Sequence, residues 1–230
     1  MLEQLGPEIW TAEGPQVVAF VGFHYPTRMV VIRLPDSGLM IWSPIALSGR
    51  LRAAVDAVGP VRHILAPNSL HHLFLAEWKT AYPDARLHAA PGLRSKRRDI
   101  DFDADLGPTP DAAWSGTVDQ VVMGGNLITS EVVFFHRPSR TAVFADLLQQ
   151  LAPGWFSGWR AVVARLDHMV GPHPSVPRKF RLAFTDRNAA RAAVRQVLDW
   201  PVERVVMAHG PLVEHDGLTC LRRAFAWLRP

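Results

Sequence analysis

The sequence is poor in cysteine and has no long apolar run. One cysteine, Cys220, occurs in 230 residues, which excludes an internal disulfide and a metal site built from several cysteines. No stretch reaches the roughly 18 apolar residues that a membrane span requires, and the N-terminus has no basic segment followed by an apolar one. We therefore expect an unprocessed cytoplasmic protein with no membrane partner.

Lysine is scarce as well, because arginine outnumbers it by 22 to 3 in a chain of formal net charge +4. Two basic clusters, Arg94–Arg98 and Arg178–Arg181, are candidates for contact with phosphates. Acidic residues follow the first cluster directly, at Asp99 and Asp101, and no recognition motif accompanies either cluster. A solvated charged face is therefore favoured, and nucleic-acid or nucleotide processing remains an alternative.

The composition is that of a folded globular protein, with 48% hydrophobic and 20% charged residues. The length allows one large domain or two small ones, and no change of composition marks a boundary. We expect a single domain over residues 1–230, with a helical insertion at about residues 147–185. Trp155 and Trp159 lie in this insertion, where their apolar surface could line a pocket, form a dimer contact or be buried in the core, and core burial is favoured.

Apolar segments and turn residues alternate along the chain. Three segments at 17–25, 29–34 and 39–43, separated by turn residues, predict an antiparallel meander. Further strands are predicted at 61–67, 85–91, 119–125, 130–136, 141–146 and 202–210, and helices after Ser48 and at 70–82, 158–169, 186–200 and 218–228. Blocks of strands with helices between them indicate a layered α/β structure in which helices cover sheets from outside.

Among ten histidines, the adjacent pair His71 and His72 stands out because it lies at the expected start of a helix. Neighbouring side chains inside a helix point about 100° apart, but at its start both can turn toward one point beyond the end. The positive end of the helix dipole disfavours imidazolium, and the neutral ring is the form that binds metal. The pair is therefore a candidate for metal ligation.

Two more polar side chains come at the ends of apolar strands. The segment "TAVFAD" ends in Asp146, and "VVMAHG" places His209 before a Gly-Pro turn. Loops at strand ends are where α/β folds carry their chemistry. We therefore expect Asp146 and His209 to belong to the same site as the histidine pair.

The order of these parts, with the segments "APNSLHH", "HRPSRT", "ADL" and "AHG", resembles the metallo-β-lactamase superfamily. Within that superfamily the chain is most similar to a family of unknown function. The resemblance covers nearly the entire chain. It implies a four-layer αββα sandwich with a site at one edge of the two sheets, where the superfamily typically holds two metal ions.

The chain departs from the signature loop of that superfamily, His-x-His-x-Asp-His. Aligned to end on His72, the loop has His71 in place of the aspartate, and Ser69 and Pro67 in place of the two leading histidines. A frame one residue later brings Asn68 onto the first histidine but replaces the last histidine by leucine, so we prefer the frame that keeps His72. Both frames lose the two leading histidines.

A third superfamily histidine precedes the hairpin that leads to the aspartate, and His136 is near Asp146 in sequence. With residues 137–140 as the turn, His136 faces Thr141, and Asp146 lies five residues, or about 16 Å, further along the strand. His136 is therefore expected at the far tip of the hairpin. The position near the site falls on Gly125 or Asn126, which offer no imidazole.

The resemblance thus implies that one metal position has lost its histidines and the other is complete, with His71, His72, Asp146 and His209 as ligands. Three histidines and a carboxylate suit one zinc ion, or iron or manganese if water expands the coordination. A deprotonated water on that ion would attack a small-molecule substrate. Asn68 and Ser69 are candidates for orienting substrate or water.

Besides nucleic-acid or nucleotide processing, two interpretations of function are open. The first is a metal-dependent hydrolase with a mononuclear site, which the survival of four ligands favours. The second is a catalytically degenerate binding or regulatory protein without metal, which the loss of half the superfamily's ligands favours. We give the hydrolase slight preference.

Overall fold

The strands and helices are taken from a computed structural model that describes all 230 residues, except for the side chain of Phe20. The strands are β1 (Leu2–Gly6), β2 (Ile9–Val18), β3 (His24–Arg33), β4 (Leu39–Trp42), β5 (Val61–Ala66), β6 (Arg86–Ala89), β7 (Ala104–Asp105), β8 (Val118–Met123), β9 (Glu131–His136), β10 (Thr141–Gln149) and β11 (Arg204–His209). The helices are α1 (Gly49–Asp56), α2 (Leu75–Ala81), α3 (Leu93–Lys96), α4 (Gly158–Leu166), α5 (Arg178–Ala183), α6 (Arg187–Asp199) and α7 (Gly217–Phe225), with short 3₁₀ turns η1 (Phe20–Gly22) and η2 (Ala226–Leu228).

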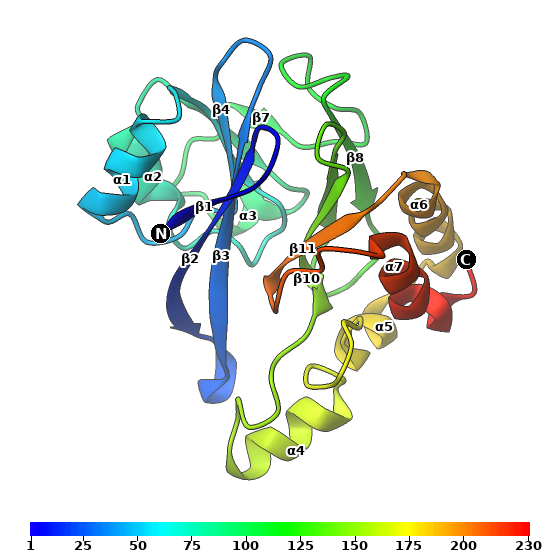
Figure 1. Ribbon diagram of the computed structural model, residues 1–230. Coiled ribbons are helices and arrows are strands. Elements are labelled where there is room, and N and C mark those ends of the chain that lie inside the picture. Colours follow the sequence, from blue (N-terminus) through cyan, green and yellow to red (C-terminus); the bar gives the residue numbers. More distant parts are fainter.

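Two sheets pack face to face (Figure 1). The larger has seven strands in the order β1 to β7, antiparallel as far as β4 and parallel from β4 to β7. The smaller has four strands in the order β11-β10-β9-β8, and its β10 and β11 run parallel. Parallel neighbours end at the same edge of a sheet, so the C-terminal ends of β10 and β11 lie side by side.

Buried side chains on both faces of each sheet define four layers. In β3, Val30 and Ile32 face the smaller sheet, whereas Met29 and Val31 face the helices, as the period of two in a strand requires. Helices α1, α2 and α3 cover the outer face of the larger sheet, and α6 and α7 cover that of the smaller sheet. The predicted four-layer αββα sandwich is confirmed.

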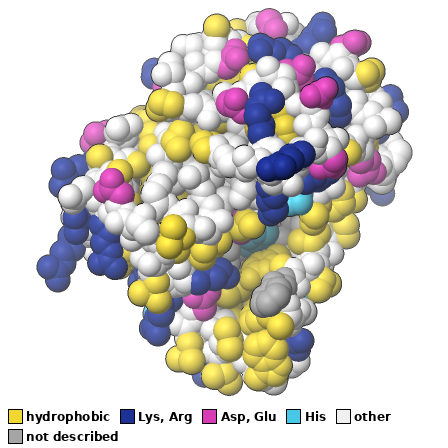
Figure 2. Space-filling view, turned by 180° about the vertical axis from the view of Figure 1, so that it is seen from behind, with side chains coloured by type: hydrophobic (Ala, Val, Ile, Leu, Met, Phe, Trp, Pro, Cys, Tyr) yellow, Lys and Arg dark blue, Asp and Glu magenta, His cyan; other side chains and the backbone are white. Residues whose placement is uncertain are grey.

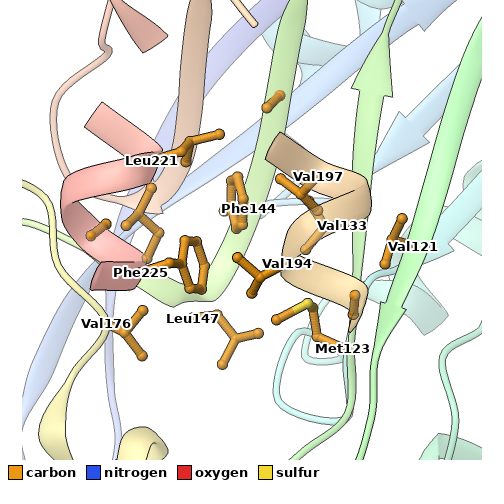
Figure 3. Packing of buried hydrophobic residues seen from close by; sticks show 14 of the residues in the cluster. Val121, Met123, Val133, Phe144, Leu147, Val176, Val194, Val197, Leu221 and Phe225 are labelled. Atoms are coloured by element: carbon orange, nitrogen blue, oxygen red, sulfur yellow. The ribbon is translucent and has the colours of Figure 1, made fainter. Parts of the chain in front are cut away.

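The outer layer of the smaller sheet holds β10 in place (Figure 3). Val194 of α6 and Phe225 of α7 pack toward Phe144 and Leu147 of β10, and all four side chains are at most 1% exposed. Burial of one such side chain contributes about 1.5–3 kcal/mol relative to its exposure. The strand that carries Asp146 is thus anchored by apolar packing directly beside that residue.

The predicted strand at 17–25 is wrong. Strand β2 ends at Val18 and β3 begins at His24, and between them the chain reverses through η1, where Val21 and Gly22 have φ angles of 51° and 75°. A left-handed conformation is unfavourable for valine, and Gly22 is the only residue of this apolar run whose type favours it. The sequence pattern therefore does not indicate the turn. The polar and Pro-containing segment before Val17 has no strand pattern, yet it forms β1 and most of β2.

The predicted start of the helix at 70–82 is also wrong, because α2 begins only at Leu75. The side-chain oxygen of Asn68 accepts hydrogen bonds from the amides of Leu70 at 2.8 Å and His71 at 3.1 Å. These two hydrogen bonds close a turn at residues 68–71, and the chain continues through further turns to Phe74 before α2 begins. His71 and His72 therefore lie in a loop, and the helix-dipole argument for their protonation state does not hold.

Most other predicted elements are confirmed. Ser48 caps α1 by accepting a hydrogen bond from the amide of Leu51 at 3.1 Å. Strand β10 continues to Gln149, so the expected insertion begins with strand, and α4 and α5 follow within it. None of the helices formed by the described residues combines the length and the hydropathy that crossing a membrane demands.

His136 lies at the tip of the β9–β10 hairpin, paired with Thr141, as predicted. Its ring is fully buried, and its Nδ1 is 2.7 Å from the hydroxyl of Ser139. Burial lowers the pKa of His136 from about 6.5 to about 4. Between these two pH values the unfolded chain binds a proton that the folded ring does not, so stability present above pH 6.5 is lost as the pH falls toward 4.

Replacement of His136 by Asn should flatten the acid side of the stability profile. One ring with this pKa shift accounts for up to about 3 kcal/mol between neutral pH and pH 4. We expect urea unfolding at pH 7.5, 6 and 4.5 to show a smaller loss of unfolding free energy for His136→Asn than for the wild type. His173→Asn, which replaces an exposed histidine, is the control and should follow the wild type. Parallel profiles for all three proteins would contradict the assignment.

Candidate metal centre

His71, Asp146 and His209 meet at the edge where the two sheets face each other. One ligand atom of each side chain lies within 4.8 Å of the others. Nε2 of His71 is 3.2 Å from Oδ2 of Asp146, and Nε2 of His209 is 3.4 Å from Oδ1. Asp146 and His209 come from the adjacent parallel strands β10 and β11, and His71 comes from the loop after β5 of the other sheet.

The loop that carries His71 is tied to the smaller sheet by backbone hydrogen bonds. The amide of Val132 donates to the carbonyl of Pro67 at 2.8 Å, and Asn68 forms a β-bridge with Glu131. The end of β11 is tied to the larger sheet in turn, because Nη1 of Arg28 donates to the carbonyls of Met207 at 2.6 Å and Gly210 at 2.5 Å. These hydrogen bonds therefore fix the distance between the His71 loop and the strand ends that carry Asp146 and His209.

Both histidine rings are oriented by hydrogen bonds on the side away from Asp146. Nδ1 of His209 is 2.7 Å from the carbonyl oxygen of Pro26, and Nδ1 of His71 is 2.6 Å from the hydroxyl of Ser43. A carbonyl oxygen only accepts, so Nδ1 of His209 carries the proton, and in a neutral ring Nε2 then presents its lone pair to the site. This is the arrangement by which proteins orient histidines that bind metal.

Asp146 is the charged member of the group. Burial by itself would raise the pKa of Asp146, but the positive charge that His71 and His209 carry when protonated, together with their hydrogen bonds, outweighs burial and holds the pKa well below its usual range. The side chain is therefore an ionised carboxylate at neutral pH. Each of its two oxygens faces one of the histidine Nε2 atoms.

Asn68 does not face substrate, contrary to the expectation from sequence. Its Nδ2 donates to Oδ2 of Asp146 at 2.8 Å and to Oε2 of Glu131 at 3.1 Å, and its Oδ1 accepts the amides of Leu70 and His71. A carboxamide has two donor hydrogens and two acceptor lone pairs, so no capacity remains for a ligand. Asn68 instead links the His71 loop to the carboxylate of Asp146.

Glu131 is the residue that sequence reasoning missed. It is fully buried; its Oε1 accepts the amide of Ala145 at 2.9 Å, and its Oε2 accepts the amides of Asp146 at 2.7 Å and Leu147 at 3.1 Å. Burial and the nearby Asp146 charge raise the pKa of Glu131 to about 7, against the lowering effect of these amides. A glutamate opening the otherwise apolar segment "EVVFFH" was the one available signal.

His72 lies outside the group, so the predicted set of four ligands is not assembled. Its Nδ1 is 3.0 Å from Nη1 of Arg97, which also donates to the carbonyl of His72, and burial lowers the pKa of His72 to about 4. A guanidinium only donates, so Nδ1 accepts and the proton of the neutral ring sits on Nε2. Neither nitrogen of His72 then offers a free lone pair.

Ser69 is also engaged elsewhere. Its hydroxyl is 2.9 Å from that of Thr129, which accepts the Ser69 amide as well, and its carbonyl accepts Nζ of Lys96 at 2.7 Å. Two arginines of the first basic cluster, a candidate for contact with phosphates, form ion pairs with acidic side chains. Arg94 pairs with Asp105 and Arg97 with Asp99, each at 2.7 Å. These pairs support the interpretation of a solvated charged face around α3.

A cavity of about 390 Å³ opens on the three side chains, and Figure 2 shows the hollow with histidine side chains visible in it. This volume falls in the range of small-molecule sites. Most of its wall is apolar, formed by Val17, Val18, Leu70, Leu73, Phe74, Ile128 and Phe180. Tyr25 and Lys179 add polar groups, with the Tyr25 hydroxyl 3.4 Å from the Lys179 ammonium.

Solved structures with the same arrangement of layers are metallo-β-lactamases. The enzyme from Pontibacter korlensis matches with a TM-score of 0.66 and 12% identity, over 100% of this chain and 98% of that chain. FIM-1 from Pseudomonas aeruginosa in its mono-zinc form matches with a TM-score of 0.62 and 12% identity, over 100% and 96%. The enzyme from Erythrobacter litoralis, with β-mercaptoethanol in its active site, matches with a TM-score of 0.66 and 13% identity, over 98% and 96%.

These likenesses establish the metallo-β-lactamase fold, in agreement with the resemblance found in the sequence. Residues 7–155 match the family DUF4336, described as a domain of unknown function. The chain therefore belongs to the DUF4336 family. No curated protein matches its sequence significantly.

Replacement of Glu131 by Gln should destabilise the fold strongly. The carboxylate accepts four N–H groups, whereas a carboxamide would turn its own N–H₂ toward at least one of them and leave buried donors unpaired. We expect urea unfolding at pH 7.5 to show a loss of about 2–4 kcal/mol. The control Glu214→Gln alters an exposed glutamate and should change the value by less than about 0.5 kcal/mol. Equal stability of the two variants would show that Glu131 does not support β10.

Proposed function

We propose that the protein is a metal-dependent hydrolase that acts on a small molecule through one divalent ion held by His71, Asp146 and His209. The observation that carries this proposal is the group of three ligand atoms within 4.8 Å of one another. Zinc suits two imidazoles and one carboxylate best, and iron or manganese are the alternatives.

The donor set fits a catalytic ion. Catalytic zinc sites have three protein ligands and keep a fourth position for water or substrate. In this chain the three donors border the cavity, which leaves the remaining coordination positions open to it. A bound divalent ion would supply Lewis acidity and an activated water at this place.

Other residues of the cavity have consistent roles. Burial raises the pKa of the Tyr25 phenol, so its hydroxyl keeps its proton at neutral pH and can donate a hydrogen bond. The ring of Tyr25 lies 5.1 Å from that of His209, and Lys179 is beside its hydroxyl. We assign Tyr25 and Lys179 to binding the polar part of a substrate, where donors stabilise negative charge that develops during hydrolysis. The apolar wall excludes water around them.

Metal content of the purified protein tests the ligand set. We expect close to one equivalent of zinc, iron or manganese per chain by mass spectrometry, lost by at least tenfold in His71→Ala, Asp146→Ala and His209→Ala. His72→Ala should keep its metal, because His72 is engaged by Arg97. His215→Ala, an exposed histidine, is the second control. An equal loss of metal in His72→Ala would show that His72 is a fourth ligand. Absence of metal from every protein would refute the proposal.

Hydrolysis is tested on the same proteins with a panel of chromogenic esters, thioesters, phosphodiesters and a β-lactam. Activity should disappear after treatment with a chelator, return with added zinc or manganese and be absent from His209→Ala. Activity that survives the chelator would show that hydrolysis does not depend on the metal.

A binding or regulatory protein without metal is the second candidate, and one observation favours it. The distances of 3.2 and 3.4 Å from Asp146 to the two histidines allow protonated rings to pair with the carboxylate directly. The three side chains would then satisfy one another without an ion. The metal measurement described above decides between the two candidates.

A further inference from the structure

Exposed apolar side chains are concentrated on one part of the surface. Apart from Met1, the large hydrophobic residues that remain exposed in the described part of the chain belong to five short segments. These residues, here called the apolar rim, are Val18, Val21, Leu70, Leu73, Leu127, Ile128, Trp159, Val162, Val163, Leu166 and Leu182. Exposed apolar surface on this scale marks an interaction site.

Helix α4 contributes the most regular part of the apolar rim. Trp159, Val162, Val163 and Leu166 follow the i, i+3, i+4, i+7 spacing of one helix face, and they are 53%, 60%, 41% and 58% exposed. The opposite face packs through the buried Ala164 onto a small apolar cluster. The favoured expectation of core burial is therefore wrong for Trp159, because α4 turns its apolar stripe outward.

The apolar rim borders the cavity at the candidate metal centre and a second hollow beside it. Four of its members, Val18, Leu70, Leu73 and Ile128, line that cavity. Val21, Val163, Leu166 and Leu182 line a neighbouring hollow of about 580 Å³, which shares Ala19, Tyr25 and Lys179 with the first. In Figure 2 hydrophobic side chains gather along both sides of the hollow in which the histidines are seen.

Positive charge accompanies the apolar rim. Residues 150–185 contain five basic side chains, Arg160, Arg165, Arg178, Lys179 and Arg181, and one acidic side chain, Asp167. Asp167 is itself engaged with Lys179, at 3.4 Å from its ammonium and 2.7 Å from its amide nitrogen. This segment therefore carries a surplus of four positive charges, as large as that of the whole chain.

We propose that the apolar rim docks on an anionic lipid surface, with α4 lying in the plane of the interface. An apolar helix stripe flanked by arginines, with an exposed tryptophan, is the pattern of helices that bind membrane surfaces, and anionic headgroups complement the cations. A second copy of this chain on the same face would oppose like charges. Docking of this kind needs no spanning segment, so it is compatible with the absence of a membrane-spanning helix among the described residues, and it differs from the expectation of no membrane partner.

Co-sedimentation of the full chain with vesicles tests the proposal. We expect binding to vesicles of phosphatidylcholine with 30% phosphatidylglycerol, weakening as salt rises from 0.05 to 0.5 M, and little binding to phosphatidylcholine alone. The variant Val162→Asp with Leu166→Asp should lower the partition coefficient by at least about 30-fold. Arg160→Gln and Arg165→Gln should each lower it by about fivefold.

A matched control separates the α4 stripe from net charge. Ala192→Asp with Gln196→Asp adds the same two charges, with the same i, i+4 spacing, to an exposed face of α6. This control should keep its partition coefficient within about threefold of the wild type. Circular dichroism and thermal unfolding confirm that each variant is folded.

Three outcomes would overturn the proposal. The first is the absence of binding to both vesicle types or equal binding to the two, and the second is an equal loss in the α4 and α6 variants. The third is a lipid-free dimer of the wild type that the α4 variant abolishes, because a second copy would then cover the apolar rim. The proposal is independent of the metal centre, so His209→Ala should bind vesicles as the wild type does.

Discussion

The candidate site depends on the carboxylate of Glu131, which accepts backbone hydrogen bonds that a neighbouring strand would otherwise accept. Backbone pairing between β9 and β10 stops at Val143, opposite Phe134. Beyond that point Glu131 accepts the amides of Ala145, Asp146 and Leu147, which would otherwise be buried without partners. The Glu131 side chain therefore stabilises the part of β10 that no longer pairs with β9. Asp146 lies in this part, at the edge of the sheet.

Asn68 extends the same network to the opposite sheet. Through Glu131, Asp146 and the amide of His71, its single carboxamide connects β9, β10 and the loop after β5. A network of this kind is stable in an apolar interior only when every member is satisfied. The loop conformation of His71 and the position of Asp146 are therefore set together.

The surroundings of the site agree with the proposed docking on a lipid surface. A small polar centre lies within a cavity whose wall and rim are mostly apolar, and the cations gather beside that rim. The polar groups are buried and held by hydrogen bonds, whereas the apolar residues of the rim are exposed. The proposed chemistry and the proposed docking would thus use adjoining parts of one face, which share Val18, Leu70, Leu73 and Ile128.

The sequence by itself determined the layered α/β class, most strands and three members of the site, although the helix start on which the choice of His71 rested does not form. Asp146 and His209 follow apolar strands directly, and such strands end at a sheet edge whatever their partners are. Local pattern did not reveal that Asn68 links the His71 loop to Asp146, that Arg97 engages His72 or that Glu131 supports Asp146. Those contacts join residues 25 to 78 positions apart or replace backbone pairing by a side chain, so only the tertiary structure could decide them.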